Sequence, residues 1–302
     1  MNMKRNGDWM EWTIHEEWTK IPLQELLKTT LRAPKALLHE WRMNKQVKVN
    51  DENPNWMKPL QVGDKLSIEL FEKETDPVIC EKHPIDILFE DDHVIILNKP
   101  IQMNTHPNEK GETGTLANAL AYYYQKNRKK IKTRHVHRLD KDTSGAVVFA
   151  KHRLAHSILN QDLIERKMKR TYVAIVHGKM KKITGTINAP IGRDRHHPVR
   201  RRVSKAGQQA ITHYEVINYC KELDCTVVKL TLDTGRTHQI RVHLSSIGHP
   251  IMGDKLYGSK NGHIKRQALH AENVTFIHPI TGEKLEIHAP FPNDIKNLLS
   301  TC

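Results

Sequence analysis

The chain has few cysteines and no long apolar run. Its four cysteines form no CxxC pair, and although Cys220 and Cys225 lie close in sequence, no second pair completes a zinc site. We therefore expect reduced thiols and no metal. No apolar segment approaches the roughly 20 residues of a membrane-spanning helix, and residues 1–18 lack the apolar stretch of a signal peptide. These absences predict a cytoplasmic protein without a membrane partner.

Acidic residues are in the minority. The 302 residues include 48 Lys and Arg against 34 Asp and Glu, which gives a net charge of +14. This excess favours a polyanionic partner such as RNA, because binding phosphates releases condensed counterions. An anionic membrane surface is an alternative partner for the same positive charge. The length suits one large domain or two smaller ones, and we expect a monomer.

The aromatic residues divide the chain. All five tryptophans precede residue 57, and all seven tyrosines follow residue 121. We therefore predict an N-terminal module at residues 1–75, with helical spacing over 23–31 and 36–41 and short strands within 47–50 and 62–70. A charged, proline-containing stretch follows. It predicts a linker, placed at 76–86, before a second domain at 87–302.

The most informative stretch is H-R-L-D-K-D-T-S-G at residues 137–145. Its last four residues are typical of a tight turn, and the apolar run 146–150 predicts a buried strand. Asp140 therefore precedes a turn at the start of a strand, with Arg138 two residues away. On spacing alone, a solvated turn acid is the favoured interpretation of Asp140, ahead of a catalytic role.

Two later stretches have similar character. Residues 169–176 alternate as a strand that contains Tyr172, after an amphipathic helix predicted at 154–169. Residues 234–244, T-G-R-T-H-Q-I-R-V-H-L, predict a turn at Gly235 and then a helix with Thr237 as its N-cap. On that helix His238 and Arg241 share a face opposite the apolar one.

These strings resemble those of the RluA-type pseudouridine synthases. The patterns that they resemble are H-R-L-D-x-x-T-S-G, K-x-Y-x-A-x-V and T-G-R-x-H-Q-x-R-V-H, with Arg170 in place of the lysine of the second. The resemblance covers roughly residues 87–290. It implies an α+β catalytic domain with a mixed, largely antiparallel sheet and a central cleft. It also implies isomerisation of uridine to pseudouridine in structured RNA, ribosomal or transfer, without a cofactor.

The resemblance assigns roles to individual residues. Asp140 matches the catalytic carboxylate, Arg241 the arginine that pairs with it, and Tyr172 the tyrosine that stacks on the base and takes or relays the carbon-5 proton. Arg138 matches the arginine that fills the space of the flipped base. The N-terminal module resembles the alpha-L RNA-binding motif, but Ala33-Pro34 stands where that motif has Ser-Arg.

Two basic runs are candidates for contact with RNA phosphates. One lies within residues 126–134 and the other within 193–205. A solvated surface is a competing explanation for the first run. The second run predicts an exposed loop, because a segment this basic would be destabilised by packing inside. The candidate residues are Lys129, Lys130, Arg200, Arg201 and Arg202.

Two other functions fit part of the sequence. A catalytically inactive RNA-binding or ribosome-assembly protein could share the scaffold, but it would have no chemical use for Asp140, Tyr172 and Arg241 together. A metal-dependent nuclease would need a cluster of carboxylates, and none surrounds Asp140 in the sequence.

Overall fold

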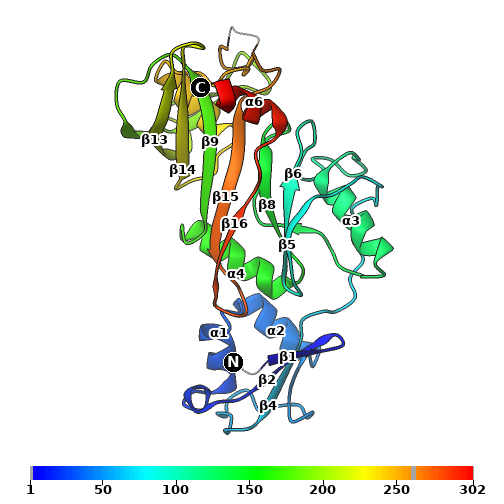
Figure 1. The fold of residues 1–302 in the computed structure, drawn as a ribbon. Helices are drawn as coiled ribbons and strands as arrows, with labels where there is room; N and C mark the ends of the chain where they lie inside the picture. Colours follow the sequence, from blue (N-terminus) through cyan, green and yellow to red (C-terminus); the bar gives the residue numbers. More distant parts are fainter. Residues whose placement is uncertain (1–2, 260–262, 302) are drawn as a thin grey trace.

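The computed structural model describes residues 3–259 and 263–301. They form a small N-terminal sheet with its helices at one end and a long twisted sheet above it (Figure 1). This α+β architecture, with a mixed and largely antiparallel main sheet, confirms the predicted fold class. No described helix is long and apolar enough to span a membrane.

The N-terminal sheet is antiparallel and has the order β1-β2-β4-β3. Its strands are β1 Met3–Asn6, β2 Trp9–Thr13, β3 Val47–Val49 and β4 Lys65–Glu69. One 3-10 turn, η1 Glu16–Trp18, and two helices, α1 Leu23–Thr29 and α2 Lys35–Met43, accompany it. The sequence predicted both helices and the last two strands, but β1 and β2 were not predicted.

Four buried tryptophan side chains help to fill the core of this N-terminal part: Trp12, Trp18, Trp41 and Trp56. This explains why tryptophan is confined to the start of the chain. The same core includes Leu154 and Ile158 from the following part of the chain. Asp162, nearly buried, accepts hydrogen bonds of 3.2 and 2.6 Å from the Arg32 guanidinium. The N-terminal part is therefore packed against the rest of the protein, not merely tethered to it.

In the part of the chain that the structure describes, the main sheet has ten strands. Its order is β10-β13-β14-β9-β15-β8-β6-β5, with β16 paired to β15 and β7 to β8. The bounds are β5 Ile87–Glu90, β6 Val94–Lys99, β7 Arg134–His135, β8 Ser144–Ala150, β9 Lys169–His177, β10 Thr184–Asn188, β13 Ile211–Cys220, β14 Cys225–Leu232, β15 Leu269–Ile277 and β16 Lys284–His288. The only parallel pairing among the described strands joins β8 to β15.

Helices cover the half of the sheet that contains β6 and β8. Val147 and Phe149 of β8 share one core with α3 Leu116–Lys126, while Val148 shares another with α4 Arg153–Ile164. Because successive strand residues point to opposite faces, both faces of β8 need apolar residues. This is why residues 146–150 read as a continuous apolar run. The remaining helices are α5 Gln239–Ser246 and α6 Asn293–Thr301.

Residues 70–86 have no helix or strand, but they are anchored. Glu74 forms an ion pair with Arg134, and the carbonyl of Ile79 accepts a 2.8 Å hydrogen bond from the Asn118 amide. The segment therefore lies along the second part of the chain.

Three local predictions were wrong. Helix α4 ends at Ile164, not at residue 169, because Arg166 adopts a left-handed conformation and the Lys167 and Met168 amides bond back to the Asp162 carbonyl. Residues 193–205 were expected to be a loop, but they contain most of a hairpin of β11 Ile191–Arg193 and β12 Arg201–Val203. The buried carboxylate of Asp194 stabilises that hairpin by accepting from Arg200 Nε at 2.7 Å.

The third error concerns the start of α5. Thr237 is not its N-cap, because His238 occupies that position with φ of 59° and makes no side-chain cap. The turn is closed instead by Gln239, whose Oε1 accepts from the Arg236 amide at 3.0 Å and from the Thr234 hydroxyl at 2.7 Å. The Gln239 side chain thus takes the role that was predicted for Thr237, since it accepts hydrogen bonds from the turn before the helix.

Candidate active site

Asp140 lies in the loop before β8, at the start of the predicted turn. The Thr143 amide donates to the Asp140 carbonyl at 3.0 Å, which closes that turn. At Gly145, φ is +120°, and an added Cβ would lie 2.2 Å from the Ala271 carbonyl oxygen. Only glycine lets β8 leave the turn this close to β15. The T-S-G sequence therefore brings the Asp140 loop to the middle of the sheet.

A buried lysine, Lys99, is hydrogen-bonded to the backbone of the same loop. Lys99 Nζ donates to the carbonyls of Pro100, Met103 and Lys141 at 2.8, 2.7 and 3.1 Å. Burial lowers the pKa of Lys99 to about 7, while Asp140 is the main group that opposes this shift. Three carbonyls match the three donors of an ammonium group. Lys99 thus ties the end of β6 to the residue that follows Asp140.

Arg241, on α5, connects two carboxylates. Its Nη1 donates to Asp140 Oδ2 at 3.0 Å. Its Nε and Nη2 form a two-point contact with Asp254, at 2.7 and 3.0 Å, and the Asp254 side chain is only 1% exposed. Burial alone would lower the pKa of Arg241, but Asp254 and then Asp140 raise it, so the guanidinium stays charged. Asp140 itself is 21% exposed and faces a hollow.

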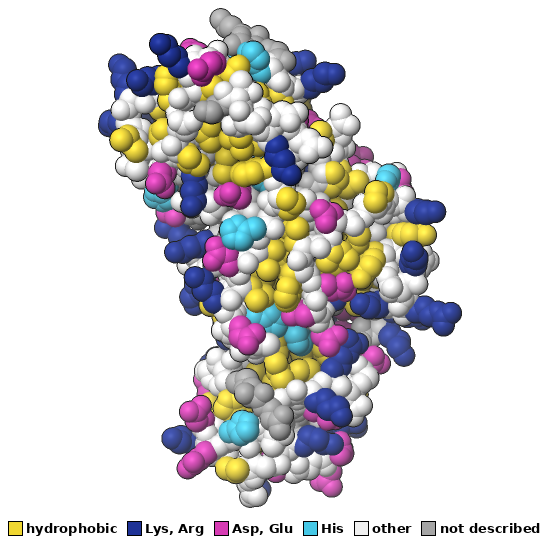
Figure 2. Space-filling view, in the orientation of Figure 1, with side chains coloured by type: hydrophobic (Ala, Val, Ile, Leu, Met, Phe, Trp, Pro, Cys, Tyr) yellow, Lys and Arg dark blue, Asp and Glu magenta, His cyan; other side chains and the backbone are white. Residues whose placement is uncertain are grey.

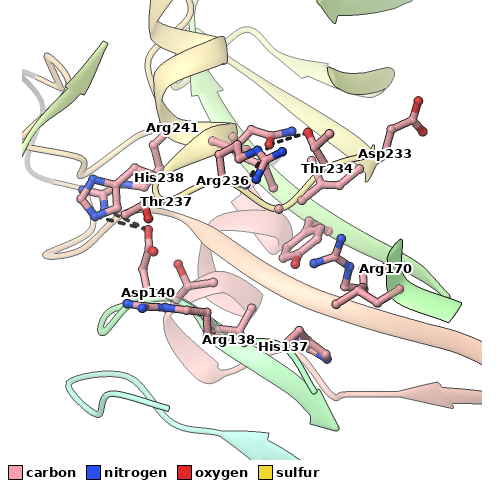
Figure 3. Close-up of a pocket in the computed structure, with 18 of the residues that line it drawn as sticks. His137, Arg138, Asp140, Arg170, Asp233, Thr234, Arg236, Thr237, His238 and Arg241 are labelled. Carbon is pink, nitrogen blue, oxygen red and sulfur yellow. Dashed lines mark hydrogen bonds and ion pairs between the residues drawn. The ribbon is translucent and has the colours of Figure 1, made fainter. Parts of the chain in front are cut away.

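That hollow has a volume of about 570 Å³, within the usual size of small-molecule sites. It is lined by Arg138, Asp140 and Tyr172 and by residues of α5 and the preceding turn (Figure 3). The Tyr172 side chain, on β9, is 4% exposed, and burial raises its pKa, so its phenol is neutral at physiological pH. The pocket combines a charged carboxylate, an aromatic ring and several hydrogen-bond donors.

His238 adds a further group beside Asp140. Its Nε2 lies 4.0 Å from Asp140 Oδ2, and its Nδ1 lies 2.9 Å from the Tyr257 hydroxyl. Burial lowers the pKa of His238, so the imidazole is neutral near pH 7. The Tyr257 oxygen also accepts from the Arg201 amide at 2.8 Å, which links β12 to the pocket.

Comparison with known proteins identifies the family. The family model described as RNA pseudouridylate synthase matches residues 93–246, and that of the RluD ribosomal pseudouridine synthase N-terminal domain matches residues 10–66. The chain is 52% identical over 301 residues to an uncharacterized RNA pseudouridine synthase of Bacillus subtilis, YhcT, covering 100% of this chain and 99% of that one. The chain belongs to the RNA pseudouridine synthase family.

Two further relatives agree with this assignment. Ribosomal large subunit pseudouridine synthase D of Haemophilus influenzae is 37% identical over 281 residues, which are 88% of this chain and 86% of that protein. The structure of human RNA Pseudouridylate Synthase Domain Containing 1 superimposes with a TM-score of 0.58 at 26% identity, covering 69% of this chain and 84% of that one. The RluA-type resemblance and the prediction of an RNA pseudouridine synthase, an isomerase that acts on RNA, are therefore confirmed.

The pseudouridine synthase fold brings only some of the predicted residues together. Asp140, Tyr172, Arg241 and Arg138 line one pocket, whereas Lys129, Lys130 and Arg200 to Arg202 do not line it. Lys129 lies three residues beyond the end of α3, where its Nζ is 3.1 Å from Glu90 Oε1. Lys and Arg side chains surround the α3 region and also occur at the far end of the molecule (Figure 2). The basic surface is thus spread out, not gathered at the pocket.

Sequence reasoning gave no role to several groups of the pocket region. Asp254 and Tyr257 lie in the segment after α5, and only the contacts with Arg241 and His238 reveal what they do. Arg170, two residues before Tyr172, lines the pocket from the same face of β9. Among the described residues, no group of three His, Cys, Asp or Glu could hold a metal ion.

Proposed function

We propose that this pseudouridine synthase isomerises uridines of ribosomal RNA, with Asp140 as its catalytic carboxylate. The observation that carries the proposal is the contact of Asp140 Oδ2 with Arg241 at 3.0 Å at the edge of a nucleoside-sized pocket. The choice of ribosomal RNA rests on relatives named for the large ribosomal subunit. Transfer RNA is the alternative substrate.

The reaction breaks the bond from ribose carbon-1′ to uracil nitrogen-1 and forms a bond from carbon-1′ to carbon-5. Carbon-5 then loses its proton, and nitrogen-1 gains one, so atoms and charge balance without an added reagent. Both attack on carbon-1′ and removal of a ribose proton require an ionised carboxylate beneath the sugar. The charged Arg241 guanidinium pairs with Asp140 and fixes the orientation of its carboxylate.

Tyr172 is suited to stack on the freed uracil and to relay the carbon-5 proton. Because burial raises the pKa of Tyr172, the residue acts as a neutral phenol rather than as a phenolate base. Its oxygen then accepts the carbon-5 proton only as its own proton leaves. We assign Arg138, exposed at the pocket rim, to the space that the flipped nucleotide vacates.

Other parts of the chain would contact the RNA backbone. We propose that residues 1–75 are the N-terminal RNA-binding module, joined by the segment 76–86 to a catalytic domain at 87–302. Lys129, Lys130 and Arg200 to Arg202 lie outside the pocket, where phosphates flanking the target nucleotide would pass. They would supply binding energy that offsets the cost of flipping the base. A monomeric, cytoplasmic enzyme remains a prediction.

Pseudouridine mapping tests the proposal. Ribosomal and transfer RNA would be mapped in cells that lack the protein, in cells with the natural protein and in cells with Asp140→Asn. We expect at least one ribosomal site that the natural protein restores and Asp140→Asn does not. Restoration by Asp140→Asn would refute the role of Asp140, and sites confined to transfer RNA would refute the substrate.

A further inference from the structure

Arg170 is a buried cation that has no acidic partner. It is 7% exposed on β9, and no carboxylate among the described residues lies within ion-pair distance of its guanidinium. Its Nε also has no hydrogen-bond partner in this part of the chain. Asp233, which lines the same pocket, pairs instead with Arg166 and His213. An unpaired buried charge is costly, so this guanidinium is suited to a ligand with acceptor atoms.

The position of Arg170 is fixed by its surroundings. Its Nη1 lies 3.1 Å from where a Cβ on Gly235 would be, so the guanidinium packs against the backbone of the turn before α5. Arg170 and Tyr172 are two residues apart on one strand and therefore share a face. Arg170 consequently faces the Tyr172 ring on which the base would stack, and its guanidinium also interacts with the Tyr172 hydroxyl.

His137 offers a second donor in the same pocket. Its Nε2 accepts from the Val148 amide at 3.3 Å, so in the neutral ring the proton is on Nδ1. That Nδ1 is buried and has no partner among the described residues. Burial, and then the charge of Arg170, lowers the pKa of His137 to about 3, which keeps the ring neutral. In Figure 3, Arg170 and His137 lie apart from the group formed by Asp140, His238 and Arg241.

Arg170 Nε and His137 Nδ1 are two unsatisfied donors in the pocket that contains the Tyr172 ring, and together they fit one nucleobase edge in particular. Uracil has two carbonyl acceptors, at positions 2 and 4. Cytosine keeps the first, but it has an amino group at position 4 that would face a donor with another donor. We propose that Arg170, assisted by His137, binds the carbonyl groups of the flipped uracil and thereby rejects cytosine. This inference rests on the proposed function, because it requires the base to enter this pocket.

The test measures discrimination, not activity. In an Asp140→Asn background, which prevents turnover, the dissociation constant would be measured for one RNA with uridine and for the same RNA with cytidine at the target position. We expect a preference for uridine that Arg170→Met reduces by about 10- to 100-fold, the value of a hydrogen bond to a charged group. Arg236→Met is the matched control, since Arg236 lines the same pocket but its Nε already donates to the Gln209 carbonyl at 3.1 Å.

The outcomes separate the two proposals. If the Asp140→Asn parent shows no preference for uridine, the base does not enter this pocket, and the proposed site itself is wrong. If the parent prefers uridine and Arg170→Met retains that preference, only the role of Arg170 is refuted. The role of Arg170 would also be refuted if Arg236→Met lost the preference for uridine to the same extent as Arg170→Met.

A second measurement avoids any effect of Arg170→Met on folding. The unchanged enzyme would be given RNA with 2-thiouridine or 4-thiouridine at the target position, because sulfur is the weaker acceptor. We expect at least one of these substitutions to lower kcat/KM by about tenfold or more. Unchanged kcat/KM with both would overturn the inference.

Discussion

Asp254→Asn separates the structural and catalytic parts of the Arg241 contacts. In the natural protein, Arg241 is 9% exposed and bonds Asp254 at two points but Asp140 at only one. The amide keeps the shape of the side chain, but it loses the charge and one acceptor. Removing one partner of a buried ion pair costs about 3–5 kcal/mol. Because Asp140 still pairs with Arg241, we expect the lower part of that range, about 3 kcal/mol.

Asp140→Asn is the matched control, since it alters the other carboxylate of the same arginine. Asp140 is 21% exposed, and without its charge Arg241 retains both contacts to Asp254. We expect a cost of about 1 kcal/mol or less, the usual value for an exposed ion pair. The two variants should therefore differ in stability by about 2 kcal/mol.

Thermal unfolding and single-turnover kinetics together test this reasoning. At about 2–4 °C per kcal/mol, Asp254→Asn should lower the Tm by roughly 6–12 °C, and Asp140→Asn by about 4 °C or less. For catalysis the order of the two variants should reverse, with Asp140→Asn the more damaging. Asp140→Asn should abolish pseudouridine formation, whereas Asp254→Asn should lower kcat by about 100-fold, through misplacement of Arg241. Equal Tm values for the two variants, or an unaffected kcat in Asp254→Asn, would refute the assignment.

Three further predictions concern other parts of the molecule. Tyr172→Phe should lower kcat strongly with near-normal RNA affinity, because the ring still provides stacking worth about 1–3 kcal/mol; wild-type kcat would reduce Tyr172 to a stacking role. In urea unfolding, stability should fall as pH drops from 6.5 toward 4, since burial lowers the pKa of His93 to about 4, and His93→Gln should flatten this dependence. RNA affinity should fall steeply with salt, and charge removal at Arg200 to Arg202 should lower the slope; a slope unchanged by that removal would exclude them.

The direction of the acid effect follows from the histidine contacts. His152 Nδ1 accepts from the Ala155 amide at 3.2 Å, so its Nε2 carries the proton that it shares with His93 Nδ1 at 3.0 Å. A proton added to His93 would place two donors against each other. The unfolded chain binds that proton near pH 6.5, whereas the folded protein binds it only near pH 4. Stability is therefore present above pH 6.5 and is lost below it.

The sequence predicted much of the local structure around the site. The turn and strand after Asp140, the strand that contains Tyr172 and the helix that contains Arg241 occur close to where the residue patterns placed them. Those patterns depend on side-chain alternation and on turn-forming residues, which act over a few positions. The pairing of Asp140 with Arg241 joins residues 101 positions apart, and only the resemblance to a family predicted it.

What escaped prediction depends on contacts between distant segments. Asp254 looks like an ordinary turn acid until Arg241 is placed beside it. His238 adopts a left-handed conformation, which is uncommon for residues other than glycine. Strands β1 and β2 are short, and they become recognisable only because β1 pairs with β2 and β2 pairs with β4. Helix α4 ends early because its last turn bonds back to the Asp162 carbonyl, which no periodicity signals.

The arrangement around Arg241 reconciles a reactive carboxylate with a stable fold. Asp254 fixes the guanidinium from the buried side, so Asp140 does not have to hold Arg241 in place and can remain partly exposed. Five arginines and two aspartates line the pocket, so its described lining is positive, as is the whole chain with its net charge of +14. The positive charge attracts the phosphates of the RNA, and one of these arginines, Arg241, also orients the carboxylate oxygen that must meet the ribose. Binding and chemistry thus depend on the same arginine-rich lining.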